Sequence, residues 1–290
     1  MSSVALALVL SAAMIHATWN LLTKSSTDKV LFIWWTGIVG SVVLLPFVVW
    51  LSPAPAWDAG VLGRVVLGAV IRATYFLALG AAYSRGDLSL VYPLARGIAP
   101  VLVPAAAVLV LGERLTLSAA VGIALVTIGV YVMNVPALTR AGVLAPLTAL
   151  KTPAAGFAAL TGLLTASYSV VDKWTIDSGV PAAWYAYLTI PVAALLLTPL
   201  AWSHPRRHAE WRAHRGPIVA VSILMTASYL LVLFALRTTP VSHVAPAREV
   251  AIVFGAILGT LVLHEPHGRQ RVVGAILIVI GVALLAQAGR

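Results

Sequence analysis

Long apolar runs, each about 20 residues in length, are the feature that most constrains this chain. Short, turn-like segments such as 84–87 and 112–116 connect them. A run of this length covers the hydrocarbon core of a bilayer when it is helical. The runs lie at 3–22, 30–51, 61–83, 88–111, 117–136, 153–173, 182–202, 217–236, 240–263 and 272–288. We therefore predict an all-α integral membrane protein with ten transmembrane helices.

The composition supports a membrane protein. Hydrophobic residues make up 61% of the chain and charged residues 10%, whereas soluble domains have roughly 45–50% and about 25%. Strands of membrane barrels alternate apolar and polar residues, and these runs do not. A cleaved signal peptide is the alternative for the first run, but no basic residue precedes it. We expect a multi-pass protein of a bacterial-type inner or plasma membrane.

The charged residues lie mostly in the connections. The net charge is +10, and beside membrane spans the expected partners of such charge are anionic lipid headgroups rather than nucleic acid. The chain contains no cysteine, which excludes disulfides and thiolate ligands or nucleophiles.

An internal repeat organises the chain. Residues 95–134 align without gaps on residues 247–286, with 14 identities in 40 positions. The identities include an arginine inside an apolar run (Arg96 and Arg248) and a glutamate in the following turn (Glu113 and Glu265). Matches of this polar kind are harder to obtain by chance than matches of apolar residues.

A second matched pair lies in the first helix of each half. The segments "HATWNLLTK" (16–24) and "TASYSVVDK" (165–173) align position for position. Each places four side chains at i, i+3, i+4 and i+7, which is one face of a helix. These polar stripes are His16, Trp19, Asn20 and Thr23 in the first half, and Thr165, Tyr168, Ser169 and Asp172 in the second.

Each half of the chain contains five runs, so the second half must begin on the opposite side of the membrane. We predict two inverted repeats, residues 1–136 and 153–290, joined by a connecting loop at 137–152. Inverted repeats with a binding site near the membrane midplane are a common construction of secondary transporters.

The segments "YPLARGIAPVLVPAAAVLVLGERLT" and "VAPAREVAIVFGAILGTLVLHEP" resemble the two EamA repeats of the drug/metabolite transporter superfamily. Glu113 fits the glutamate that follows the fourth span of each family repeat, while Glu265 is preceded by His264 and departs from it. The resemblance implies a ten-helix carrier whose central cavity is lined by spans 1, 3, 4, 6, 8 and 9. It does not imply a substrate, because the superfamily moves many classes of solute.

Charged residues inside the runs are the leading candidates for the binding site, since each costs roughly 2.5–3.5 kcal/mol at a helix centre. Arg96 and Arg248 are repeat-equivalent, and two guanidinium groups on one cavity suit an anionic group. Tyr92 lies one turn before Arg96, and Arg72 adds a further cation in the third run. The alternative is that these arginines form fixed ion pairs, for example Arg96 or Arg72 with Glu249.

The two stripes complete the predicted substrate site. Trp19 and Tyr168 offer flat rings for stacking, and His16, Asn20, Ser169 and Asp172 offer polar groups. The alternative is that polar side chains simply join neighbouring helices by hydrogen bonds.

Glu249 and His243 are the candidates for proton coupling, because a carboxyl group or an imidazole in a partly dry cavity can titrate. The alternative is that Glu249 permanently neutralises a nearby arginine and that His243 is an interfacial residue with satisfied hydrogen bonds.

These patterns predict a secondary active transporter that moves a small polar metabolite, anionic or zwitterionic, by alternating access. The alternative is an exporter of drugs or metabolites with broader or cationic specificity. An intramembrane enzyme is disfavoured, because "HEPH" (264–267) lacks H-E-x-x-H spacing and the chain has no G-x-S-x-G motif. We predict no catalytic residues, no metal and no cofactor.

Two further features leave alternatives open. Glycines seven residues apart, Gly122 and Gly129 in one run and Gly274 and Gly281 in another, permit close helix packing within the protein or across a homodimer. Lysines and arginines are more numerous in the loops opposite the termini. The positive-inside rule therefore places the termini outside, whereas the family resemblance implies cytoplasmic termini.

Overall fold

The computed structural model describes residues 1–23, 26–85, 88–148, 152–263 and 268–288, and at positions 51, 83–84, 88–96, 146–148 and 262–263 it describes the backbone alone. The described residues form α-helices and no strand. In chain order the helices are α1 (Ser3–Thr23), α2 (Lys29–Val43), α3 (Leu45–Leu51), α4 (Ala59–Arg85), α5 (Leu88–Leu111), α6 (Leu117–Asn134), α7 (Arg140–Thr148), α8 (Pro153–Asp177), α9 (Ala182–Trp202), α10 (Arg207–Leu236), α11 (Val241–Ala247), α12 (Val250–Leu263) and α13 (Arg269–Gln287).

Eight helical segments in the described part of the chain are long and apolar enough to cross a membrane. They lie in α1, α4, α6, α8, α9, α10, the pair α11–α12, and α13. Lys29–Val43 and Gly97–Leu111 are shorter apolar helices. The prediction of an all-helical, multi-pass membrane protein is therefore confirmed.

The helix boundaries differ from the predicted runs where proline or polar residues act on the backbone. The second run divides at Leu44 into α2 and α3, just before Pro46. α10 begins well before its apolar run and is kinked at His214, where φ is −126° and ψ is 19°. The connecting loop contains α7, which the sequence did not predict.

The ninth run is interrupted. α11 ends at Ala247 and α12 begins at Val250, with Arg248 and Glu249 between them. Here the amides of Glu249, Ala251 and Ile252 donate to carbonyls only three residues back, at 3.0, 3.0 and 2.9 Å. Such tight 3₁₀ turns inside a helix often mark functional hinges, and Pro246 contributes because its nitrogen has no hydrogen to donate. The repeat-equivalent helix α5 is continuous.

Polar side chains and glycines fix several helix ends. The Asp28 carboxylate accepts from the amides of Val30 and Leu31 at the start of α2. The hydroxyl groups of Thr116 and Thr152 do the same for α6 and α8. Gly112 and Gly179 follow α5 and α8 with φ of +68° and +81°, the left-handed conformation that ends many helices.

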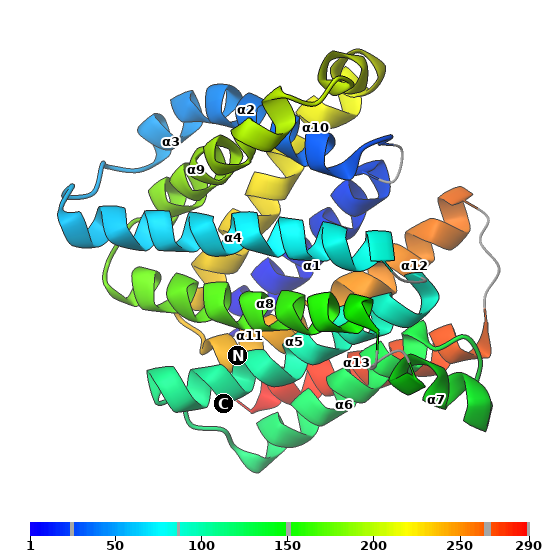
Figure 1. Cartoon of the computed structure of the whole chain (residues 1–290). Helices are drawn as coiled ribbons and strands as arrows, with labels where there is room; N and C mark the ends of the chain where they lie inside the picture. The colour runs from blue at the N-terminus through cyan, green and yellow to red at the C-terminus, as the bar shows by residue number, and fades with distance from the viewer. Residues whose placement is uncertain (24–25, 86–87, 149–151, 264–267, 289–290) are drawn as a thin grey trace.

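The two halves of the chain pack against each other rather than forming separate bodies. α1 packs on α10 and α4 packs on α8, which are equivalent contacts if the halves are repeats. α2 likewise packs on α9, and α6 packs on α13. Figure 1 shows α6 and α13 side by side along one edge of the bundle, with α4 and α8 crossing its middle.

The α6–α13 contact is a seam of glycines. A Cβ atom added to Gly129 would lie 2.8 Å from the carbonyl oxygen of Gly274, and one added to Gly122 would lie 2.9 Å from that of Gly281. Only glycine permits the two backbones to approach this closely. The four glycines therefore serve packing inside the protein, which was one of the two predicted uses.

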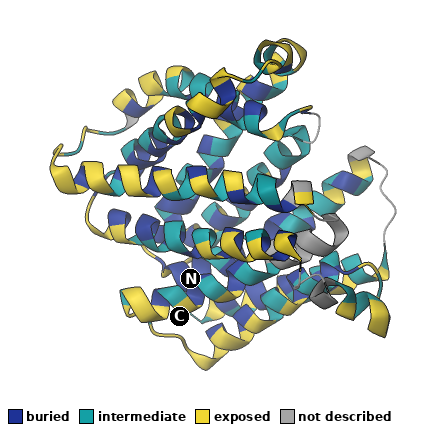
Figure 2. Ribbon diagram, in the orientation of Figure 1, coloured by how far each residue is buried: buried dark blue, intermediate teal, exposed yellow. Residues whose placement is uncertain are grey.

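Apolar residues cover much of the outside as well as the core. Figure 2 shows exposed positions along the outer edges of α4, α6 and α8, and they include large apolar side chains such as Leu67, Leu117 and Leu163. The largest buried cluster takes residues from both halves, among them Val9, Val126 and Ile278. Apolar surface of this kind fits contact with lipid tails rather than water.

Hydrogen bonds between the halves tie the helix ends together. The amino group of Met1 donates to the Ala286 carbonyl at 2.9 Å, which places the start of α1 beside the end of α13. Figure 1 shows the two termini close together. On the other side of the bundle, the carboxylate of Glu210 accepts from the amides of Thr27 and Asp28, both at 3.1 Å.

Candidate functional site

A buried ion pair joins the two halves near the centre of the bundle. Arg72 lies in the middle of α4, and Asp172 lies near the end of α8. The Nη2 atom of Arg72 is 2.8 Å from Oδ1 and 2.7 Å from Oδ2 of Asp172. The side chains are 14% and 4% exposed, so each charge depends on the other for compensation.

Three tyrosines surround this pair. The hydroxyl groups of Tyr185 in α9 and Tyr229 in α10 donate to Oδ1 of Asp172 at 2.9 and 3.0 Å. Tyr229 also accepts a hydrogen bond from Arg72. The guanidinium carbon lies 4.5 Å from the ring centre of Tyr229 and 4.9 Å from that of Tyr168, within range of a cation–π interaction. We call these five side chains the guanidinium cage.

A glycine gives the cage its room. A Cβ atom at Gly68 would lie 2.5 Å from the hydroxyl oxygen of Tyr185. The carbonyl of the same residue accepts from Nη1 of Arg72 at 3.2 Å. The absence of a side chain at position 68 therefore allows Tyr185 to reach Asp172.

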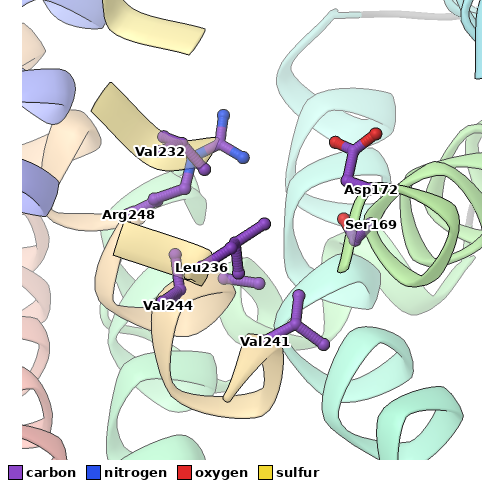
Figure 3. Close-up of a pocket in the computed structure, with 8 residues that line it drawn as sticks. Ser169, Asp172, Val232, Leu236, Val241, Val244 and Arg248 are labelled. Carbon is purple, nitrogen blue, oxygen red and sulfur yellow. The ribbon is translucent and has the colours of Figure 1, made fainter. Parts of the chain in front are cut away.

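Asp172 also belongs to a small cavity beside the cage. The cavity has a volume of about 10 Å³, close to the space that one water molecule needs. Its lining comes from α8, α10, and the α11 helix with the residue after it: Ser169, Asp172, Val232, Leu236, Val241, Val244, Ala245 and Arg248. Figure 3 shows Asp172 and Ser169 on one wall and Arg248 on the opposite one.

Arg248 differs from Arg72 in its surroundings. It is the first residue of the interruption between α11 and α12. No residue in the described part of the chain forms a hydrogen bond or an ion pair with its guanidinium group. A half-buried guanidinium group that borders a cavity and has no such partner is suited to bind an anionic group of a ligand.

The residues predicted for coupling lie on either side of Arg248 in the chain. Glu249 is half-buried at the interruption and interacts with other groups of the protein. His243 is 5% exposed in α11, and its Nδ1 lies 3.3 Å from the hydroxyl oxygen of Ser242. The Glu113 carboxylate accepts from the amides of Val241 and Ser242 at 2.8 and 3.0 Å. The predicted loop glutamate thus holds the start of α11.

The stripe on α1 lies away from this cavity. Trp19 packs on the apolar cluster of Phe32, Ile218 and Val221, and its ring meets the ring of His16 edge-on at 4.6 Å. Asn20 donates to the His16 carbonyl one turn back, at 2.9 Å. In this conformation the α1 stripe supports helix packing, while Ser169 and Asp172 of the α8 stripe border the cavity and Tyr168 joins the cage.

Two predicted residues are only partly described. Tyr92 and Arg96 lie in α5, but their side chains are outside the described part of the structure, and Glu265 lies outside it altogether. The sequence reasoning did not single out Tyr185 and Tyr229. The sequence did contain a signal for such partners. An arginine and an aspartate buried in different spans each require polar groups nearby, and tyrosine hydroxyls in neighbouring spans can supply them.

The arrangement places opposite charges on facing walls of a cavity inside a bundle of apolar helices. The lining of the cavity comes from the second half, and the first half reaches its wall through the ion pair of Arg72 with Asp172. Together the fold and the site define a multi-pass membrane transport protein. The chain belongs to the EamA-like transporter family, whose family model matches residues 3–135 and 152–287.

Comparisons with individual proteins agree with the family. The chain is 35% identical over 109 residues to the "Probable 4-amino-4-deoxy-L-arabinose-phosphoundecaprenol flippase subunit ArnE" of Enterobacter sp. (strain 638), a match that covers 36% of this chain and 98% of that protein. A solved crystal structure of another protein superposes with a TM-score of 0.76 at 18% identity, covering 100% of this chain and 99% of the other. At that identity the likeness concerns the fold alone.

Proposed function

We propose that the protein is a secondary active transporter that moves a small polar metabolite, anionic or zwitterionic, by alternating access. In this proposal the chain has ten transmembrane spans in two inverted halves, 1–136 and 153–290, joined by 137–152. The equivalent contacts of α1 with α10 and of α4 with α8 support this organisation. Alternating access would exchange the conformations of the two halves around the cavity.

One observation carries the proposal: the guanidinium group of Arg248 borders the cavity between α8, α10 and α11 without a hydrogen bond or ion pair to any described residue. A charge in the membrane interior requires a compensating partner or a function. A solute anion would supply that partner during transport. Ser169 and Asp172, on the facing wall, would contact the polar remainder of the solute.

Purified protein, reconstituted in liposomes, tests this proposal. Solutes that raise the thermal unfolding midpoint of the protein are first selected from a library of small anionic and zwitterionic metabolites, and their uptake is then measured. We expect Arg248→Ala and Arg96→Ala each to abolish uptake with near-normal expression. Arg237→Ala, which changes an exposed arginine at the end of α10, is the matched control and should transport normally. Undiminished transport by both Arg248→Ala and Arg96→Ala would exclude an arginine clamp.

Proton coupling through Glu249 and His243 is part of the same proposal. His243 is buried beside the residues that Glu113 caps, and Glu249 lies at the interruption that we expect to move. If either residue carries the proton, Glu249→Gln or His243→Gln should stop uptake driven by a pH gradient. Exchange of labelled solute across the membrane, which needs no net proton movement, should continue.

The second candidate function is translocation of the polar headgroup of a lipid. The named cargo of the ArnE relative carries both an amino group and a phosphate on undecaprenol, and this chain covers nearly the whole of that protein. Export of drugs or cationic metabolites is the other alternative. A lipid substrate would be distinguished by transport that requires the lipid chain, because the free headgroup would then neither bind nor move.

A further inference from the structure

The guanidinium cage contains a cation that belongs to the protein. The guanidinium carbon of Arg72 lies 4.9 Å from the ring centre of Tyr168 and 4.5 Å from that of Tyr229, and its Nη2 contacts both oxygens of Asp172. Aromatic faces combined with a carboxylate also recognise the ammonium groups of ligands. The cage therefore has the chemistry of a site for an alkylammonium or guanidinium ion, with a side chain occupying it.

Asp172 connects this cage to the cavity. Its Oδ1 accepts from Arg72, Tyr185 and Tyr229, whereas its Oδ2 accepts only from Arg72 among the described residues. The same side chain lines the cavity opposite Arg248. At about 10 Å³ the cavity has room for one water molecule, so a solute requires it to widen. The solute would then meet a carboxylate on one wall and a guanidinium on the other.

We propose that the solute carries an ammonium group as well as an anionic group, and that its ammonium replaces Arg72 at Asp172 while Arg248 holds the anion. The inference rests on the transport function proposed above and names its substrate class. Replacing one cation by another keeps Asp172 neutralised, and the anionic group neutralises Arg248, so the cation left without a carboxylate becomes Arg72 in place of Arg248. An anion that lacks the ammonium group leaves the Arg72–Asp172 pair intact and gains only the contact with Arg248.

The exchange also has a mechanical result. Arg72 belongs to the first half of the chain and Asp172 to the second, so their ion pair links the halves. A bound ammonium group breaks this link, and Arg72 keeps its hydrogen bond to the Gly68 carbonyl within its own helix. Without solute the ion pair keeps the two halves linked. Binding of a solute with an ammonium group breaks the pair and frees the halves to move.

The test compares matched probes that differ by the amino group. Binding to the full-length protein in lipid nanodiscs is measured by calorimetry for 2-aminoethylphosphonate against ethylphosphonate, phosphoethanolamine against ethyl phosphate, and β-alanine against propionate. We expect the aminated member of at least one pair to bind at least tenfold more tightly. This comparison uses the wild-type protein and does not depend on the folding of a variant.

Variants then separate the proposed exchange from a purely structural ion pair. Arg72→Gln removes the internal competitor. We expect this variant to bind the aminated probe about tenfold more tightly and to bind the matched probe without the amino group as the wild type does. Asp172→Asn should remove the preference for the amine. Asp177→Asn, which changes an exposed carboxylate one turn beyond the cage, is the matched control and should keep the preference. If the Arg72–Asp172 ion pair has only a structural role, Arg72→Gln should instead weaken binding of both probes.

Three outcomes overturn the inference: equal binding within every pair, weaker binding of the aminated probe to Arg72→Gln, or binding of none of the six probes. Each is distinguishable from failure of the proposed function, because uptake of another solute that is lost in Arg248→Ala would leave the transport proposal standing.

Discussion

Removing the negative charge of the cage should destabilise the protein strongly. Asp172→Asn keeps the shape of the side chain and leaves an oxygen that can accept from Tyr185 and Tyr229. However, hydrogen bonds to charged groups contribute about 1.5–3 kcal/mol and neutral ones about 0.5–1.5 kcal/mol. Converting both tyrosine bonds from charged to neutral therefore lowers the free energy of unfolding by roughly 2 kcal/mol. Arg72 is also left without its carboxylate.

The total loss of stability caused by Asp172→Asn follows from the burial of the Arg72–Asp172 pair. Asp172 is 3% exposed, and removing one partner of a buried ion pair typically costs about 3–5 kcal/mol. We expect a loss of this size in the free energy of unfolding. Lys173–Asp177 supplies the control, because its N–O distance is also 2.7 Å but Asp177 is 51% exposed. Asp177→Asn should cost no more than about 1 kcal/mol.

Unfolding by sodium dodecyl sulfate in mixed micelles, followed by tryptophan fluorescence, measures both variants. The double variant Arg72→Gln/Asp172→Asn should recover at least about 2 kcal/mol of the loss, since neither charge is then left alone. If Asp172→Asn and Asp177→Asn destabilise the protein equally, the Arg72–Asp172 pair does not have the compensating role described here.

Two further predictions concern helix contacts, measured by the same unfolding assay. Gly274→Ala places a Cβ atom 2.6 Å from the carbonyl oxygen of Gly129 and should cost about 1–3 kcal/mol. Gly156→Ala, whose Cβ meets nothing within 4 Å, should stabilise by about 0.4–1 kcal/mol; equal effects would contradict a tight glycine seam. Glu113→Gln should cost about 1 kcal/mol, because it weakens the two amide hydrogen bonds at the start of α11, and no loss would show that this cap is dispensable.

The sequence predicted the features that depend on local pattern. Apolar length located the spans, and glycines at intervals of seven indicated close packing of two helices without identifying α6 and α13 as partners of each other. It did not predict the interruption after Ala247, because residues 240–263 read as one apolar run. Pro246 permits a kink there, but helix geometry around a proline depends on the neighbouring helices.

Arg72, Tyr168 and Asp172 were candidates, but their association in one cage escaped prediction for a different reason. The repeat directed attention to Arg96 and Arg248, which match across the halves. Arg72 and Asp172 have no charged counterpart in the other half; the residue equivalent to Asp172, for example, is Thr23. Their partnership depends on how α4 crosses α8, which no pattern within one segment encodes. The tyrosines that complete the cage come from α9 and α10 and share no periodicity with either residue.

The interruption between α11 and α12 makes the two halves mechanically unequal. Its counterpart α5 runs unbroken, so the helical backbone is interrupted in one half and continuous in the other. The equivalent positions also differ in sequence, since Pro246 and Glu249 correspond to Leu94 and Gly97, so an exchange of conformations between the halves would not give two equivalent states. Under the alternating access proposed above, the inward- and outward-facing states would then differ in free energy even without solute, and the carrier would have a preferred resting side.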